Sequence, residues 1–160
     1  SHAYTSTQAI VDAPSSKIRR GRAAAANFVP TTTGAAVATT QVLPQLQGKF
    51  DGVAVRAPIP CGSISDMVFL LEKDTTVEEI NAVLTEEAES EKYQGIFGVT
   101  NEPLVSSDIV GITYGSLADL EMTRVVDGNL VKIMAWYDNE MSFTSQMIRE
   151  GVRVAEQRGF

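Results

Sequence analysis

Side chains suited to binding anions recur through the first sixty residues. The hydroxyl donors are Thr5, Thr7, Thr31, Thr32 and Thr33, and the permanent cations are Arg19, Arg20, Arg22 and Arg56. A guanidinium group suits bidentate contact with phosphate. Thr33 and Gly34 open a helical pattern, where unpaired N–H groups attract anions. These residues predict a phosphate site at that helix start, although a threonine there also fits an ordinary helix cap.

His2 is the one histidine of the chain. Its ordinary pKa of ~6.5 suits proton exchange near neutrality. A lone histidine close to a chain end also fits a surface residue, or a Ser-His remnant of tag removal. The basic residues 17–22 likewise fit a solvated face. The net charge of −7 argues against a nucleic-acid partner.

Cys61 is the single cysteine, so the chain holds no internal disulfide, which suits a reducing cytoplasm. Cys61 precedes an apolar strand pattern, and we interpret it as a small buried thiol rather than a nucleophile. We expect no metal site. No apolar run reaches the ~20 residues that a membrane helix needs, so we expect no membrane partner.

The periodicity of the chain predicts an α+β fold with a mixed, largely antiparallel sheet and helices packed on one face. We expect a long ordered loop over residues 4–28, helices over 34–46, from 75 onward and over 140–158, and strands over 53–57, 64–72, 96–100 and 124–137. The run 64–72 is apolar on both faces, which is typical of a central strand. Asp127-Gly128 predicts a hairpin turn, and the Thr75–Glu78 segment a capping box.

Six motifs in order, spread from His2 to about Ile148, resemble the catalytic domain of phosphorylating glyceraldehyde-3-phosphate dehydrogenases. They are His2-Ala3-Tyr4-Thr5-Ser6-Thr7-Gln8, Arg19-Arg20-Gly21-Arg22-Ala23-Ala24, Pro30-Thr31-Thr32-Thr33-Gly34-Ala35-Ala36, Val55-Arg56-Ala57-Pro58, Glu102-Pro103-Leu104-Val105-Ser106 and Ala135-Trp136-Tyr137-Asp138-Asn139-Glu140. On this resemblance, residues 1–160 form one C-terminal catalytic domain, and residues 4–28 form a loop that meets a neighbouring subunit.

The resemblance implies a role for each matching residue. His2 is the catalytic base beside a nucleophilic cysteine. Thr5, Thr7 and Arg56 bind the C3 phosphate of glyceraldehyde 3-phosphate, and Arg20, Thr33 and Gly34 bind inorganic phosphate. Asn139 binds the nicotinamide of NAD. The resemblance further implies a cytoplasmic homotetramer of glycolysis.

Departures from the family pattern qualify these expectations. Met141-Ser142-Phe143 replaces a segment that usually ends in tyrosine, and Pro58–Ser63 differs from the usual Pro-Thr-Pro-Asn-Val-Ser. The nucleophilic cysteine and the nucleotide-binding domain would precede Ser1, and no Gly-x-Gly-x-x-Gly follows a strand. We therefore expect the isolated chain to be inactive and to bind NAD poorly. Two alternatives stay open: an erythrose-4-phosphate dehydrogenase, and a non-catalytic assembly module that keeps the fold.

Overall fold

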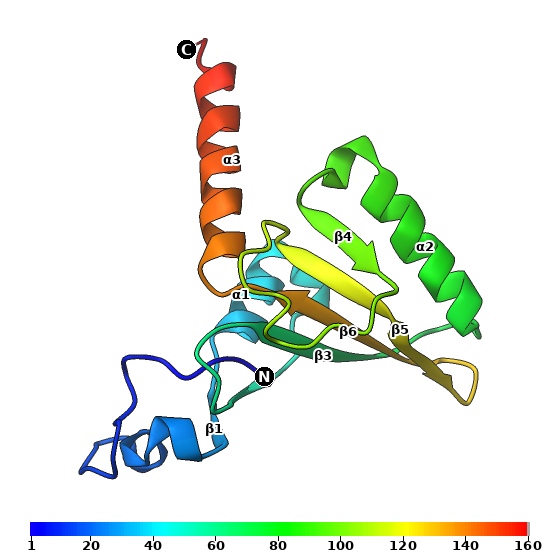
Figure 1. Cartoon of the computed structure of the whole chain (residues 1–160). Helices are drawn as coiled ribbons and strands as arrows, with labels where there is room; N and C mark the ends of the chain where they lie inside the picture. Colours follow the sequence, from blue (N-terminus) through cyan, green and yellow to red (C-terminus); the bar gives the residue numbers. More distant parts are fainter. Residues whose placement is uncertain (160) are drawn as a thin grey trace. The chain divides into compact units, whose positions relative to one another are not determined.

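The computed structural model describes residues 1–159 and divides into two compact units, Ser1–Pro60 and a second unit that begins at Cys61. Figure 1 shows the elements of both. The chain has an α+β fold with mostly antiparallel strand pairs, as the sequence predicted. None of the helices in the described part of the chain is long and apolar enough to cross a membrane.

The first unit is built on a two-stranded antiparallel ribbon of β1 (Val29–Thr32) and β2 (Val53–Arg56). The segment between them holds α1 (Ala35–Val42) and the short 3₁₀ helix η3 (Pro44–Leu46). The start of the chain lies along β2, because His2 forms a parallel bridge with Arg56. Its amide donates to the carbonyl of Val55 over 2.9 Å, and its carbonyl accepts from the amide of Ala57 over 2.8 Å. Three separate stretches of sequence therefore meet at β2.

The predicted loop 4–28 is held together by its own hydrogen bonds, and its regular structure is limited to the 3₁₀ helices η1 (Ile18–Gly21) and η2 (Ala24–Ala26). The Ala13 amide donates to the carbonyl of Gly21 over 2.8 Å. A Cβ at Gly21 would collide with the Ala13 carbonyl oxygen, so the close approach requires glycine. The Asp12 carboxylate accepts from the Arg22 guanidinium over 2.8 Å and from the Ala23 amide over 2.9 Å.

The second unit contains a four-stranded sheet in the order β3-β6-β5-β4. Its strands are β3 (Ser63–Leu70), β4 (Phe97–Thr100), β5 (Ser116–Val126) and β6 (Leu130–Tyr137). The pairs β3–β6 and β5–β6 are antiparallel and β4–β5 is parallel. The β5–β6 turn confirms the predicted hairpin, because Asp127 and Gly128 both have positive φ, at 51° and 77°. Its loop also includes Asn129, since Val126 pairs with Leu130.

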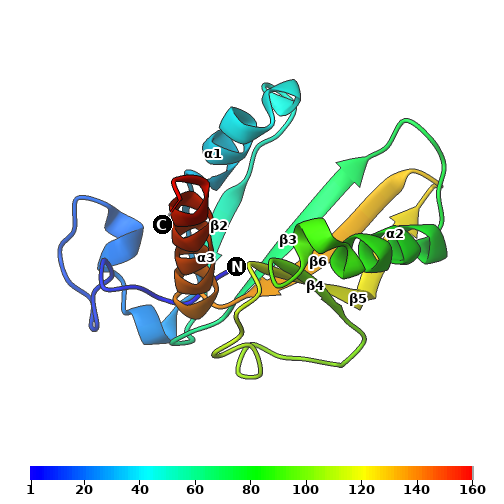
Figure 2. The same cartoon turned by 90° about the horizontal axis from the view of Figure 1, so that it is seen from above.

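Two helices of the second unit relate differently to this sheet. Helix α2 (Val77–Glu89) lies beside β4 and β5, where the Asn81 amide donates to the carbonyl of Leu120 over 3.1 Å. Helix α3 (Met141–Gln157) starts where β6 ends and runs away from the sheet (Figure 1, Figure 2). Its first turns are anchored, because Gln146 donates to the carbonyls of Gly95 and Thr113.

The structure corrects the expected position of one strand. Strand β3 lies at an edge of the sheet and exposes Val68 and Leu70, at 60% and 76% of their surface, so the apolar run 64–72 does not mark a central strand. One of the two apolar faces of this strand is therefore exposed rather than packed against other elements. Helix α3 likewise leaves the apolar side chains of Met147 and Ile148 exposed.

The helix starts also differ from prediction by one residue each. The capping box of α2 uses Thr76 and Glu79 rather than Thr75 and Glu78, because Thr76 Oγ1 accepts from the Glu79 amide and the Glu79 carboxylate from the Thr76 amide. Both pairs have the same spacing, so the sequence could not separate them. The N-cap of α1 is Gly34, and Thr33 stands just before it.

Candidate functional site

His2 is half-buried and is held in one tautomer. Its Nδ1 lies 2.7 Å from the carbonyl oxygen of Ala3. Because a carbonyl oxygen only accepts, Nδ1 carries the proton and the lone pair is on Nε2. Burial lowers the pKa of His2, and the charge of Arg56 lowers it further, against the opposing effect of the Ala3 hydrogen bond. His2 is therefore a neutral imidazole near pH 7 and can accept a proton at Nε2.

Arg56 is buried, with 8% of its surface exposed, and neutral oxygens hold it. Its Nη1 donates to Thr5 Oγ1 over 2.9 Å, to Thr7 Oγ1 over 2.8 Å and to Gln8 Oε1 over 3.2 Å. Its Nε is buried without a hydrogen-bond partner. In the described residues Arg56 takes part in no ion pair, so its charge is not compensated by a carboxylate. Such a cation attracts anions.

The two threonines form a pair that leaves one hydroxyl proton for a ligand. Thr5 Oγ1 and Thr7 Oγ1 lie 2.8 Å apart, so one hydroxyl donates to the other. Both oxygens also accept from Arg56. The second hydroxyl proton is not needed for the contact between them and can be donated to an incoming oxygen. The structure thus brings together His2, Thr5, Thr7 and Arg56.

Arg20 joins the same side of the ribbon through Thr31. Its Nη2 donates to Thr31 Oγ1 over 3.3 Å. Val29 pairs with Arg56, and Thr31 lies two residues further along β1, so Thr31 and Arg56 share one face. His2 shares that face, because it bridges Arg56. The proximity of the two cations contributes, after burial, to lowering the pKa of Arg56.

Thr33 and Gly34 follow β1 directly and begin α1. The Thr33 hydroxyl accepts from the amide of Ala35 over 3.1 Å, so it serves the start of the helix. Gly34 is exposed and, as the N-cap residue, has no side chain with which to cap the helix. No described hydrogen bond joins Arg20 to either residue. Arg20 is thus linked to Thr33 and Gly34 only through Thr31, which precedes them in the chain. By contrast, Thr5 and Thr7 contact Arg56 directly.

Asn139 lies in the second unit and lines a cavity of about 330 Å³ between β6 and the start of α3. Its Oδ1 accepts from the Ser63 hydroxyl over 3.1 Å, which orients the amide. Phe143 lines the same cavity with an apolar ring and is 70% exposed. Ser142 is buried and accepts from the Asp138 amide over 2.9 Å. The Met141–Phe143 segment thus fixes the helix start and leaves an apolar wall beside Asn139.

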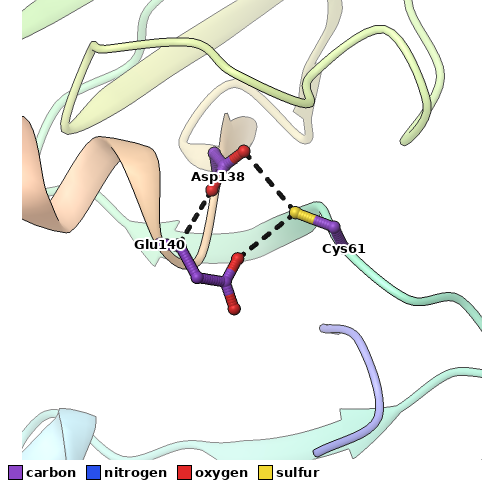
Figure 3. Close-up of side chains that lie close together, drawn as sticks. All are labelled: Cys61, Asp138 and Glu140. Atoms are coloured by element: carbon purple, nitrogen blue, oxygen red, sulfur yellow. Dashed lines mark hydrogen bonds between the residues drawn. The ribbon is translucent and has the colours of Figure 1, made fainter.

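Cys61 lies against two carboxylates, as Figure 3 shows. Its Sγ is 3.5 Å from Asp138 Oδ2 and 3.3 Å from Glu140 Oε2. Burial and then these two acids raise the pKa of the thiol. Cys61 is therefore a protonated, weakly nucleophilic thiol. Cys61 is half-buried, whereas the sequence pattern indicated a small buried thiol.

The carboxylates beside Cys61 have a structural explanation. Asp138 is buried, and its Oδ1 accepts from the amides of Glu140 and Met141 over 2.8 and 2.7 Å, while its Oδ2 accepts from the amide of Gly111 over 2.8 Å. Burial alone would raise the pKa of Asp138, but these three donors lower it. Sulfur and carboxylate oxygens lie within 4.8 Å of one another and can ligate metals. Here they already fix the start of α3, which accounts for their arrangement.

Gln8 is the residue of the site to which sequence reasoning gave no role. It is buried, with 8% of its surface exposed, and it contacts Arg56 directly. It stands at the end of the first motif, three residues after Thr5. A polar amide directly after a Thr-x-Thr pattern was a signal that the sequence offered.

Chemically, the first unit offers an imidazole that can accept a proton and, beside it, a cation and hydroxyl groups of the kind that suit an anion. Comparison with known proteins is consistent with this chemistry. A family model described as "Glyceraldehyde 3-phosphate dehydrogenase, C-terminal domain" matches residues 1–139. The chain belongs to the glyceraldehyde-3-phosphate dehydrogenase family, to whose C-terminal domain it corresponds.

Individual relatives agree. The chain is 52% identical over 153 residues to a glyceraldehyde-3-phosphate dehydrogenase of Clostridium acetobutylicum. The aligned region covers 92% of this chain and 44% of that protein. The same comparison gives 49% over 147 residues for the enzyme of Haloarcula vallismortis, with 92% and 43% covered, and 50% over 153 residues for that of Streptococcus pyogenes serotype M1, with 92% and 44%. The chain spans less than half the length of these relatives.

Proposed function

We propose that this chain supplies the base and the anion-binding residues of a phosphorylating glyceraldehyde-3-phosphate dehydrogenase. The overall reaction converts glyceraldehyde 3-phosphate, phosphate and NAD to 1,3-bisphosphoglycerate and NADH. The observation that carries the proposal is the pairing of a neutral His2 with Arg56, a buried cation that no carboxylate neutralises in the described residues.

His2 acts as the base in this proposal. Its Nε2 accepts the proton of a cysteine thiol, which the rest of the polypeptide supplies, so that the thiolate can attack the aldehyde carbon. The lowered pKa of His2 keeps the imidazole neutral and ready to accept. The hydrogen bond from Nδ1 to Ala3 holds the ring in the productive tautomer. His2 then donates a hydrogen bond to the oxygen of the tetrahedral adduct.

Two groups of residues bind the two phosphates. Arg56 and the hydroxyls of Thr5 and Thr7 bind the C3 phosphate, which supplies the negative charge that Arg56 lacks. Arg20, with Thr33 and Gly34 at the start of α1, binds the inorganic phosphate that releases the product. The Nε of Arg20 is buried without a hydrogen-bond partner and is a further donor for this phosphate.

Asn139 fits the nicotinamide of NAD, which accepts hydride from the substrate adduct when bound. The Ser63 hydroxyl donates a hydrogen bond to Asn139 Oδ1. The amide nitrogen of Asn139 is therefore left to donate to the nicotinamide carboxamide. Phe143 offers an apolar wall to the same cavity in place of a tyrosine hydroxyl. The side chains present thus support NAD binding by the whole enzyme.

We also propose that the enzyme works as a homotetramer in the cytoplasm. The exposed apolar side chains of β3, β5 and β6, namely Val68, Leu70, Val126 and Leu130, lie on one face of the sheet, since Leu70 pairs with Leu130 and Leu130 with Val126. Adjacent exposed apolar residues of this kind favour burial against another subunit. The single, protonated thiol suits a reducing compartment.

A chimeric enzyme tests this function. The chain is joined behind the N-terminal part of the Clostridium acetobutylicum relative, and NADH formation is followed with glyceraldehyde 3-phosphate. We expect turnover that depends on added phosphate, whereas the isolated chain should give none. Turnover with erythrose 4-phosphate alone would favour the erythrose-4-phosphate enzyme. A folded tetrameric chimera without any turnover would favour an assembly module.

A further inference from the structure

Gln8 is oriented by two hydrogen bonds to the same atom. Its Oε1 accepts from the backbone amide of Thr5 over 3.1 Å and from Arg56 Nη1 over 3.2 Å. Its Nε2 is buried and has no hydrogen-bond partner. A side-chain amide normally satisfies both of its ends when it is buried. Gln8 satisfies only its acceptor.

Rotating the amide would not repair this. A flipped Gln8 would turn its NH₂ group towards the Thr5 amide and Arg56 Nη1, which are both donors. The observed orientation is therefore the one that the surrounding donors require. It keeps Oε1 on Arg56 and leaves a buried donor unpaired, which destabilises the folded chain.

A carboxylate would satisfy this position better. Glutamate has the same shape as glutamine, would keep both contacts of Oε1, and would remove the unpaired N–H donor. It would also form an ion pair with Arg56. The present glutamine instead holds Arg56 with a neutral oxygen, as Thr5 and Thr7 do. All three described side-chain acceptors on Arg56 are thus uncharged.

We propose that Gln8 is a positioning residue that aims Arg56 at the substrate phosphate while leaving its positive charge uncompensated. This inference rests on the proposed function, because the phosphate is that of the aldehyde substrate. The neutral amide makes the site selective for a dianionic phosphate ester over an unphosphorylated aldehyde. The unpaired Nε2 of Gln8 lowers the stability of the folded chain, and the selectivity for phosphate esters accompanies this loss.

The test compares Gln8→Glu and Gln8→Met with the parent chimera and with Gln41→Glu, a matched change at an exposed glutamine of α1. For Gln8→Glu we expect KM for glyceraldehyde 3-phosphate to rise at least about tenfold with kcat changed by less than about threefold, since a charged contact is weakened. Gln8→Met should raise KM less. Kinetics with unphosphorylated glyceraldehyde should stay unchanged in both, and Gln41→Glu should alter neither substrate.

The thermal midpoint of the chain separates this role from a structural one. Gln8→Glu should melt at or above the parent temperature, although it binds phosphate esters more weakly. An unchanged KM in Gln8→Glu, or equal losses with both aldehydes, would overturn the inference while leaving the dehydrogenase function standing. If the parent chimera has no activity, calorimetric titration with glycerol 3-phosphate decides, and equal affinity of Gln8→Glu and parent overturns the inference.

Discussion

The two units differ in whether the charged side chains of their polar clusters are balanced by surrounding groups. In the first unit, Arg56 is buried among neutral oxygens, and Arg20 adds a second cation on the same face. In the second unit, Cys61 faces two carboxylates, and Asp138 is balanced by three backbone N–H groups. The first cluster has buried donors without hydrogen-bond partners at Gln8, Arg20 and Arg56. In the second cluster both carboxylate oxygens of Asp138 accept from backbone amides. A site ready for a ligand is thus marked by unbalanced charge rather than by the number of polar groups.

The largest expected effect comes from His2. In the chimera, His2→Asn should lower kcat by roughly 10²–10⁴-fold, because the thiol loses its general base. Steady-state NADH formation measures this change. A variant with nearly full kcat would show that the first unit binds ligand without taking part in proton transfer.

Arg56 should give the next largest effect. Arg56→Ala should reduce kcat/KM for glyceraldehyde 3-phosphate by at least about tenfold, because a charge-assisted hydrogen bond contributes about 1.5–3 kcal/mol. Arg153→Ala is the control, since Arg153 is an exposed arginine that pairs with Glu150 on α3. Equal losses in the two variants would contradict the special status of an uncompensated cation.

The thiol of Cys61, beside Asp138 and Glu140, should react slowly with alkylating reagents. At pH 8, Cys61 should react with iodoacetamide several-fold more slowly than a free thiol, because burial and the two acids raise its pKa. Glu140→Gln removes one of these acids and should speed the reaction. Mass spectrometry of the alkylated chain measures the rate. Faster alkylation than that of a free thiol would mean that Cys61 belongs among the reactive groups after all.

The smallest expected effect is on the pH profile. Since the pKa of His2 is lowered, its neutral form persists below the usual ~6.5, and the acid limb of kcat/KM in the chimera should fall below that value. Removing the Arg56 charge should move this limb upward, because Arg56 contributes to the lowering. Kinetics between about pH 5 and 8 measure the limb, and an acid limb above ~6.5 would contradict the burial of the imidazole.

Local patterns in the sequence predicted much of this structure. Asp127-Gly128 fixed the hairpin, because few other residue pairs accept two positive φ values. The motif that contains His2 and Thr5 predicted residues that the structure joins around Arg56. No role was predicted for Gln8, because its place after the Thr-x-Thr pattern signals a polar residue at the site but does not reveal its contact with Arg56.

Other features depended on surroundings that the sequence does not encode locally. The edge position of β3 follows from strand order, which the apolar run containing Val68 cannot reveal. The choice of Thr76 over Thr75 as cap follows from where Thr75 is held, since its amide donates to the carbonyl of Gly128. Tertiary contacts thus decided between locally equivalent options.

The pairing of His2, Arg56 and Val29 across three neighbouring segments has an evolutionary consequence. Side chains alternate along a strand, so a slip of β2 by one residue would turn Arg56 away from the face that it shares with Val29 and His2. The positions after Gly34 in the segment that joins β1 to β2 can then vary more freely than the strands, provided that the ribbon keeps its alignment. The alignment of two short strands thus sets which side chains meet the loop residues that contact Arg56.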